Sequence, residues 1–302
     1  MPEKTATLAF VAVEGQAGPA HTAEATVRSP ESVAGAAQLA CVLEASAEKP
    51  GNVTPRHDFH DMAYEDMLRS AIAIGPELGR AGERGVGATV LAAVTASRRV
   101  APANTNLGIA LLLAPLAKAA LGGGPLRERL GTTLRALGVA DAREAYAAIR
   151  AAGAGGLRER VEHDVRSEPA IGLREAMASA AARDSIASEY VTDYALTFET
   201  GVPALAAALA DGLPVRAAIV EVHLRLLARA PDTLIARKRG ADAAAQVTAG
   251  ARGVLAAGGV RGGEALRRFD ASLREPGNAL NPGTTADLVT AVVFVALVEG
   301  ML

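Results

Sequence analysis

The chain has 302 residues, of which 50% are hydrophobic and 3% aromatic, and its formal net charge at pH 7 is −2. A chain of this length can bury a large core, and so few aromatic residues mean that Ala, Leu, Val and Ile must build it. The small net charge and the lack of a long basic stretch exclude a nucleic-acid polymer as the expected partner. The single cysteine, Cys41, excludes an internal disulfide framework and fits a reducing, cytoplasmic environment.

The start of the chain and its apolar segments indicate a protein without a membrane anchor. Glu3 and Lys4 precede an apolar run that is shorter than a secretory signal requires. The most apolar segments, residues 107–117 and 288–298, fall short of the ~18 residues that a membrane span needs. Residues 1–28 are mixed in character and predict an N-terminal arm or a short strand.

From residue 29 onward the pattern is helical. Ser29, Pro30 and Glu31 form a typical helix start, with a serine cap, a proline in the first turn and an early acid. Apolar spacing and Gly/Pro punctuation then predict helices at 62–74, 88–98, 107–121, 126–137, 140–152, 174–198 (with a break near 183–184), 203–210, 214–228, 233–239, 241–257, 264–273 and 286–298. Strand-like alternation is almost absent, so the sequence predicts an all-α fold, with one large multi-helix domain over residues 29–302.

Several short polar segments, called polar islands below, interrupt this apolar helical pattern. The first spans residues 44–61, from the end of the first helix onward. Glu44 stands where the helical pattern asks for a core residue, and a rigid Lys49-Pro50-Gly51-Asn52 break comes next. Asp58 and Asp61 are three residues apart and are spaced to share a cation; carboxylates at this density favour Mg²⁺. The alternative is a charged loop whose aspartates cap the next helix.

Two more islands stand at the starts of helices. Asn104 and Asn106 precede an apolar helix, where such residues either cap the helix or present amides to an anion or a base. Asp287 heads an apolar stripe in the last helix, and a buried charge there must be paired or bind a metal. Residues 184–193 are a weaker candidate, better explained as a solvated acidic face.

The remaining island is the short helix that Asp232 opens and Gly240 ends. Three cations, Arg237-Lys238-Arg239, occupy its last turn. They fit the helix dipole, and they fit equally well a grip on phosphate oxygens.

The order of these islands resembles that of the triphosphoribosyl-dephospho-CoA synthase family, from about Ser29 to the C-terminus. The resemblance rests on EAS, KPGNV, HDFHD, NTNLG, DT with a downstream Arg and Gly, and NPGTTADL. It implies an all-helical transferase that displaces adenine from ATP. It further implies that the triphosphoribosyl group is attached to the ribose 2′-hydroxyl of dephospho-CoA, to make the precursor of a prosthetic group.

The same resemblance implies roles for individual residues. The carboxylates that would stabilise positive charge at the reacting ribose or accept the hydroxyl proton are Glu44, Asp58 and Asp61. Mg²⁺ would be held by Asp61, Asp232 and Asp287. The groups expected to contact the substrates and their phosphates are Lys49, Asn52, Asn104, Asn106, Arg237, Lys238, Thr284 and Thr285.

The chain also departs from the family pattern, which indicates a divergent branch. Asn106 and Leu107 stand in place of a histidine and a lysine, and the expected acidic glycine motif in mid-chain is not evident. The acceptor therefore stays open between a dephospho-CoA-like molecule and another coenzyme precursor, including a different phosphorylated substrate in one-carbon coenzyme biosynthesis.

Two other functions remain as alternatives to the transferase. One is a hydrolase resembling ADP-ribosylglycohydrolases, and the other is a helical ligand-binding scaffold without enzymatic activity. A prenyltransferase is disfavoured because its DDxxD signature is absent. A homodimer is compatible with an Ala-rich helical exterior.

Overall fold

The computed structural model describes residues 27–101, 105–153 and 165–302, and over these ranges it is all-helical without a strand. Two isolated β-bridges, Thr54–His57 and Phe59–Met62, lie in the turn between the first two helices. The predicted fold class is confirmed. Residues 1–26, which make up most of the predicted N-terminal arm, lie outside the described residues.

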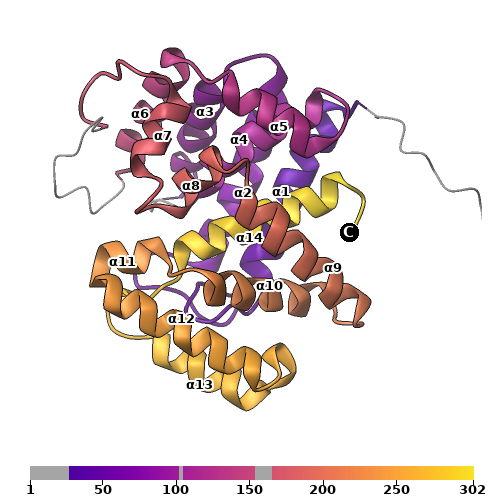
Figure 1. Cartoon of the computed structure of the whole chain (residues 1–302), viewed down its shortest axis with the longest axis vertical. Helices are drawn as coiled ribbons and strands as arrows, with labels where there is room; N and C mark the ends of the chain where they lie inside the picture. Colours follow the sequence, from indigo (N-terminus) through magenta and orange to yellow (C-terminus); the bar gives the residue numbers. More distant parts are fainter. Residues whose placement is uncertain (1–26, 102–104, 154–164) are drawn as a thin grey trace, which may run out of the picture.

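Fourteen α-helices of the described part follow one another through short connections (Figure 1). In chain order they are α1 (Pro30–Ser46), α2 (Tyr64–Gly79), α3 (Val86–Arg98), α4 (Leu107–Leu121), α5 (Leu126–Arg135), α6 (Val139–Ala152), α7 (Leu173–Ala180), α8 (Ser185–Val191), α9 (Val202–Ala210), α10 (Val215–Arg229), α11 (Thr233–Arg239), α12 (Ala241–Ala256), α13 (Gly263–Leu273) and α14 (Gly283–Val298). Short 3₁₀ turns η1 (Arg80–Gly82) and η3 (Gly259–Arg261) and a π-helical turn η2 (Leu196–Gly201) complete the set.

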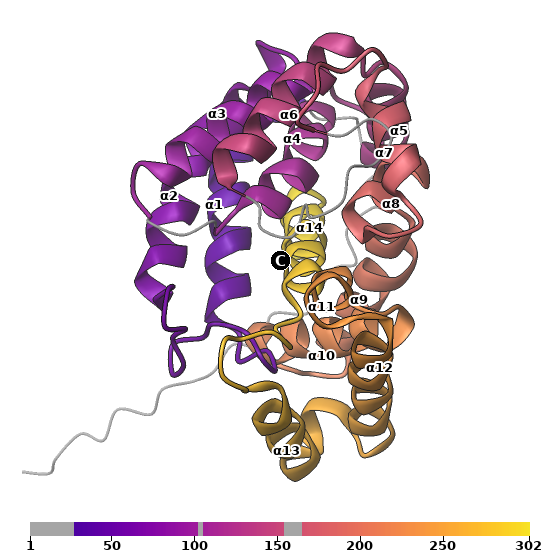
Figure 2. The ribbon, with the colours of Figure 1, turned by 90° about the vertical axis from the view of Figure 1, so that its left-hand side faces the viewer.

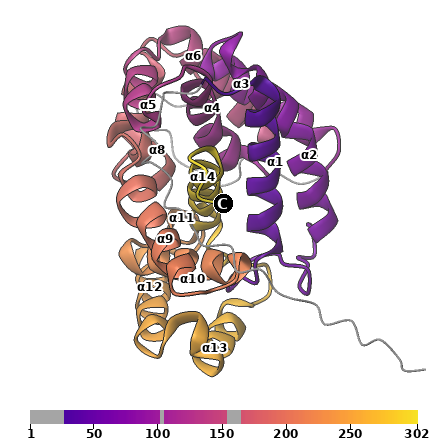
Figure 3. The ribbon, with the colours of Figure 1, turned by 90° about the vertical axis from the view of Figure 1, so that its right-hand side faces the viewer.

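The last helix, α14, runs through the middle of the molecule. Figures 2 and 3 show α1 and α2 on one side of it and α8 and α9 on the other, with α10, α12 and α13 gathered at one end. Nearly every residue of α14 is buried. A helix that is apolar on all sides is stable only when protein surrounds it, which explains this central position.

Most of the predicted helices are confirmed to within a few residues. Helices α4 and α11 begin and end where the sequence predicts. The predicted break near Arg183 is confirmed too, because α7 ends before it and Asp184 caps α8. Two boundaries are wrong. The helix expected to stop at Ile74 continues through Pro76 to the end of α2, and the helix expected to reach Phe198 ends at Val191 in α8, before η2.

Pro76 is tolerated inside α2 because another helix supplies the missing donor. A proline has no N–H, so the carbonyl four residues earlier loses its helical partner. For Pro76 that carbonyl belongs to Ile72, and Gln38 of α1 donates its side-chain amide to it at 2.9 Å. The compensation lies on a neighbouring helix, which explains why local sequence signals predicted a helix end.

The same device occurs in α4, where Pro115 leaves the Leu111 carbonyl without a helical donor. The buried hydroxyl of Tyr190 donates to that carbonyl at 2.6 Å. A second buried hydroxyl, that of Tyr194, donates to the next carbonyl, Leu112, at 2.9 Å. Together the two tyrosines fasten the middle of α4 to the segment around α8.

In the part of the chain that the structure describes, no single helix is long and apolar enough to cross a membrane. Helices α4 and α5 reach the necessary length and composition only when taken together, and the chain bends by 115° between them.

Removing the Tyr190 hydroxyl is expected to destabilise the fold. Tyr190→Phe leaves the Leu111 carbonyl buried and unpaired, so we expect the free energy of unfolding to fall by about 2 kcal/mol. Tyr194→Phe is the matched control: in regular helix geometry the amide of Leu116 also reaches Leu112, and a smaller loss is expected. Denaturant unfolding measures both. In a Pro115→Ala background, which restores the helical N–H, Tyr190→Phe should cost less, and an unchanged cost would contradict this account.

Candidate active site

Asp287, one turn into α14, lies where the starts of α4 and α8 approach α14. A Cβ added to Gly108 of α4 would lie 2.0 Å from the Asp287 Oδ2 and 2.8 Å from Ile186 of α8. Only glycine at position 108 leaves room for this carboxylate. The Asp287 side chain is half-buried, and within the described part of the chain its oxygens accept no hydrogen bond and form no ion pair.

Charged groups from distant parts of the sequence surround Asp287. Burial raises the pKa of Asp287 well above its usual value, and the negative charges of Glu44, Asp232 and Asp184 raise it further. The positive charge of Arg237 acts in the opposite direction. The fold therefore brings together the predicted polar islands that contain Glu44, Asp232 and Asp287. The oxygens of Asp287 are available to a ligand.

Asp232 is also buried, but both of its oxygens are occupied. Its Oδ1 accepts from the amides of Leu234 (2.9 Å) and Ile235 (3.1 Å) and so caps α11. Its Oδ2 accepts from the amide (2.7 Å) and the hydroxyl (2.8 Å) of Thr285. Burial raises the pKa of Asp232, and these four hydrogen bonds lower it. Asp232 thus joins the start of α11 to the start of α14, and Thr285 is engaged in the same junction.

The start of α8 joins this junction through Asp184. Its Oδ1 caps α8, and its Oδ2 lies 3.4 Å from the Arg237 guanidinium. The Thr233 hydroxyl accepts from the Ser185 amide at 3.4 Å and donates to the Thr284 hydroxyl at 3.2 Å. The sequence pattern made residues 184–193 only a weaker candidate, explained as a solvated acidic face, and it did not select Gly108. That explanation is wrong for Glu189, which is fully buried. The usable signals were a glycine in the first turn of an apolar helix and an acid in position to cap the next helix.

Glu44 and Lys49 form a buried ion pair at the end of α1. The Lys49 Nζ lies 3.0 Å from the Glu44 Oε1, and both side chains are almost completely buried. The thiol of Cys41, one turn before Glu44, has a raised pKa because it is buried near the charges of Glu44 and Asp287. Glu44 therefore lies on the side of α1 that faces the Asp287 site.

The rest of the first island packs elsewhere. Asn52 is buried and donates its side-chain amide to the Pro50 carbonyl at 3.1 Å. Asp58 is exposed and accepts from the Tyr64 amide at 2.8 Å, as a helix-capping residue does. The Asp61 carboxylate is 62% exposed, and its neighbour is His60 at 3.8 Å. The structure does not bring Asp58 and Asp61 to Asp287.

The asparagines before α4 are only partly covered by the structure. Asn104 lies outside the described residues. Asn106 is buried two residues before Gly108, and its side-chain amide nitrogen has no hydrogen-bond partner among the residues that the structure describes. A buried amide without a partner is costly, so this N–H is available for a ligand.

The last-turn cations of α11 are exposed. Arg237 faces Asp184, Arg239 lies 3.6 Å from Glu275, and Lys238 is exposed to solvent.

No group of three or more His, Cys, Asp or Glu side chains suited to hold a metal ion occurs among residues 27–101, 105–153 and 165–302. Asp61, Asp232 and Asp287 thus do not form a cage made of protein ligands alone.

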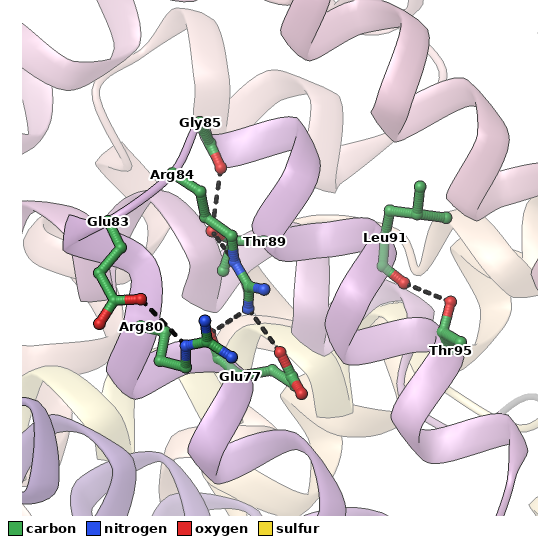
Figure 4. Close-up of polar contacts among 8 residues, drawn as sticks. All are labelled: Glu77, Arg80, Glu83, Arg84, Gly85, Thr89, Leu91 and Thr95. Atoms are coloured by element: carbon green, nitrogen blue, oxygen red, sulfur yellow. Dashed lines mark hydrogen bonds and ion pairs between the residues drawn. The ribbon is translucent and has the colours of Figure 1, made fainter.

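A hollow on another face of the molecule contains none of the predicted site residues. It is lined by residues of α2, α3 and α6, namely Glu77, Ala88, Leu91, Ala92, Thr95, Ala96, Arg99 and Glu144. Figure 4 shows the polar contacts beside it, where Arg84 pairs with Glu77 at 2.7 Å and Arg80 with Glu83 at 3.0 Å. Of the charged residues that line the hollow, Glu77 is paired with Arg84, and none belongs to the motifs of the family resemblance, so the Asp287 site is the stronger candidate.

Comparison with known proteins identifies the family to which the chain belongs. A family model described as CitG: ATP:dephospho-CoA triphosphoribosyl transferase matches residues 30–302. The chain belongs to the CitG family. A solved structure described as a proposed triphosphoribosyl-dephospho-CoA synthase from Archaeoglobus fulgidus is similar, with 30% identity and a TM-score of 0.62 over 77% of this chain and 99% of that one. A search of curated proteins found no match.

CitG membership confirms the resemblance seen in the sequence and the transferase class. It implies ATP and dephospho-CoA as substrates and a place in prosthetic-group biosynthesis. The hydrolase, prenyltransferase and scaffold alternatives receive no support from the comparisons.

Filling the space at Gly108 is expected to disable the site. In Gly108→Ala the new methyl group would displace the Asp287 carboxylate, so we expect kcat/KM for adenine release from ATP to fall at least about 100-fold, the scale on which small misplacements act. Gly253→Ala in α12 is the matched control, because a Cβ there meets nothing within 4 Å. A Gly108→Ala enzyme with wild-type activity would exclude Asp287 from the site.

A buried histidine next to the ion pair predicts a pH-dependent stability. Burial and the charge of Lys49 lower the pKa of His223 from its usual 6.5 to about 3. The unfolded chain therefore binds a proton at this residue between those values while the folded chain does not, and stability falls as pH decreases from 6.5 toward 3. At pH 5 the loss from this group is about 2 kcal/mol.

His223→Leu removes this titration. Denaturant unfolding at pH 7 and pH 5 should show a decrease in stability that is smaller in His223→Leu than in the wild type. The same exchange at the exposed His57 provides the comparison. An identical decrease in the wild type and in His223→Leu would show that His223 does not titrate as described.

Proposed function

We propose that the site around Asp287 carries out triphosphoribosyl transfer from ATP to the ribose 2′-hydroxyl of dephospho-CoA or a closely related coenzyme precursor. One observation carries this proposal: the starts of α4, α8, α11 and α14 and the end of α1 converge on one unpaired carboxylate. Four of these segments, the end of α1 and the starts of α4, α11 and α14, contain motifs on which the family resemblance rests.

The reaction replaces one bond to the ATP ribose by another. The C1′–N9 bond to adenine breaks, and a bond forms between C1′ and the acceptor oxygen. The proton of the acceptor hydroxyl leaves through a base, and adenine gains a proton, so that the products are neutral adenine and the linked triphosphoribosyl acceptor. Positive charge develops on the ribose as adenine leaves, so a carboxylate close to C1′ lowers the barrier.

Glu44 is the residue that we assign to this task. It is held as an ion pair at the edge of the site and lies near Asp287. A carboxylate in this position can stabilise the developing charge or accept the hydroxyl proton. Asp58 and Asp61, the other two carboxylates predicted to be catalytic, lie on the exposed loop after α1, and we assign the chemistry to Glu44 in preference to them.

Mg²⁺ fits this site when the substrate supplies part of its coordination. Mg²⁺ is commonly held by one or two carboxylates together with phosphate oxygens and water. Asp287 has free oxygens, and Asp184 lies close enough for its charge to raise the pKa of Asp287, so these two would hold the ion. The bound ion would neutralise the triphosphate. Asp232 fits this role less well, because four donors already occupy its oxygens.

The remaining polar groups suit the two ends of ATP. Arg237 and Lys238 are exposed cations next to the Asp184 side of the site and would bind the triphosphate. Thr284, at the start of α14, would add a hydroxyl to the same region. The unpartnered amide of Asn106 would contact adenine or a ribose hydroxyl.

The test is release of adenine from ATP in the presence of Mg²⁺ and dephospho-CoA, followed by chromatography, with mass spectrometry of the acceptor. Asp287→Asn is expected to lower turnover at least about 100-fold and to raise the Mg²⁺ concentration needed for half-maximal rate. Asp61→Asn, the same exchange on the exposed loop, should have a much smaller effect. Asp242→Asn on the surface of α12 controls for the loss of a charge alone.

Each outcome has a separate meaning. Adenine together with an acceptor of increased mass supports the proposal, whereas adenine together with free triphosphoribose would indicate hydrolysis. Adenine release that depends on Asp61 but not on Asp287 would move the reaction away from the proposed site. Replacing dephospho-CoA by other coenzyme precursors identifies the acceptor.

A further inference from the structure

Lys49 carries a buried charge that the reaction scheme does not use. Its side chain is 0% exposed, although it belongs to the sequence motif expected to bind phosphate. An ammonium group has three donors. Those of Lys49 are directed to the Glu44 Oε1 at 3.0 Å, the Glu44 carbonyl, and the Ala47 carbonyl at 3.3 Å. No donor is left for a phosphate oxygen.

The turn that carries Lys49 is held in place from the other side. The Gly51 amide donates to Asp270 of α13 at 2.8 Å, and Arg274 donates to the Asn52 carbonyl at 3.2 Å. Arg274 also pairs with Asp270 at 2.9 Å. A Cβ on Gly51 would lie 2.8 Å from Leu273. The turn is therefore packed against α13, and its amides do not form an open phosphate loop.

The surroundings of the ammonium group leave Glu44 as its counter-ion. His223 of α10 is fully buried near Lys49, and its lowered pKa keeps the imidazole neutral. Among the described residues, the positive charge of Lys49 is therefore paired with the negative charge of Glu44. Glu44 in turn is close enough to Asp287 to influence it by charge.

The geometry points to Lys49 as a positioning residue that holds the Glu44 side chain in a fixed orientation at the edge of the candidate site. Lys49 does not bind the triphosphate. This inference rests on the proposed function for the role of Glu44. It separates two lysines that sequence reasoning had grouped together: Lys49 acts through Glu44, and the exposed Lys238 contacts phosphate.

Steady-state kinetics on Lys49→Met, Glu44→Gln and the double variant test this assignment. Lys49→Met should lower kcat about 100-fold, the scale of a lost acid–base group, while KM for ATP stays within about threefold of wild type. The double variant should be no slower than Glu44→Gln within about threefold, because the two residues act as one unit. Lys238→Met, the matched exchange at the surface, should instead raise KM for ATP.

Thermal unfolding shows whether a loss of activity reflects a loss of folding. Lys49→Met leaves Glu44 buried without its partner and should lower the unfolding midpoint, and adding Glu44→Gln should recover part of that decrease. A double variant that is as unstable as the sum of the single changes would show that the two residues are not coupled and would overturn the inference.

ATP binding in the absence of acceptor separates this inference from the proposed function. Lys49→Met is expected to bind ATP with a dissociation constant within about threefold of wild type. A weakening of tenfold or more, with kcat retained, would make Lys49 a phosphate ligand and refute the positioning role. If the wild-type enzyme releases no adenine, the proposed function fails, and the binding and unfolding measurements still decide what Lys49 does.

Discussion

The buried carboxylate of Asp232 holds the candidate site together. Its two oxygens accept four hydrogen bonds, two from the start of α11 and two from Thr285 at the start of α14. A buried charge is tolerated only when its hydrogen-bonding capacity is filled, and filling it here requires that two helices 50 residues apart in sequence meet end to end. That meeting places Arg237 of α11 on the same side of the molecule as Asp287 of α14. The rest of the site is arranged around this junction.

Three carboxyl groups of the described residues, Glu189, Asp232 and Asp287, have a pKa raised by burial, and they differ in how their oxygens are satisfied. Glu189 is fully buried, and its oxygens accept from the Leu196 amide and from the amide and hydroxyl of Thr197, so its function is to fix the turn before η2. Asp232 is satisfied in the same way. Asp287 has no such donors among the described residues, although burial and three neighbouring carboxylates make its negative charge costly. Proteins keep a carboxylate without hydrogen-bond donors where a bound ligand supplies the missing partner.

The fold class could be predicted from the sequence because its signals are local. The Ser29 cap, the Asp232 cap and the left-handed Gly240 all lie within a few residues of the ends that they define. Part of the site was also visible, because Glu44 and Asp287 interrupt apolar stripes. What the sequence does not contain is the direction of a side chain. Lys49 turns back to Glu44 because α13, more than 200 residues later, holds its turn. Asp184 matters because Arg237, 53 residues away, reaches it.

The hydrogen bonds that Tyr190 and Tyr194 donate to α4 affect how the start of that helix can move. A proline within a helix creates a point of easy bending, since one backbone bond is missing there. In α4 that point is Pro115, and the half of the helix before it carries Asn106 and Gly108. The Tyr190 hydroxyl takes the place of the missing bond and ties that half to α8, whose first residues follow Asp184. A bend of α4 at Pro115 would therefore carry the start of α4 and the start of α8 together.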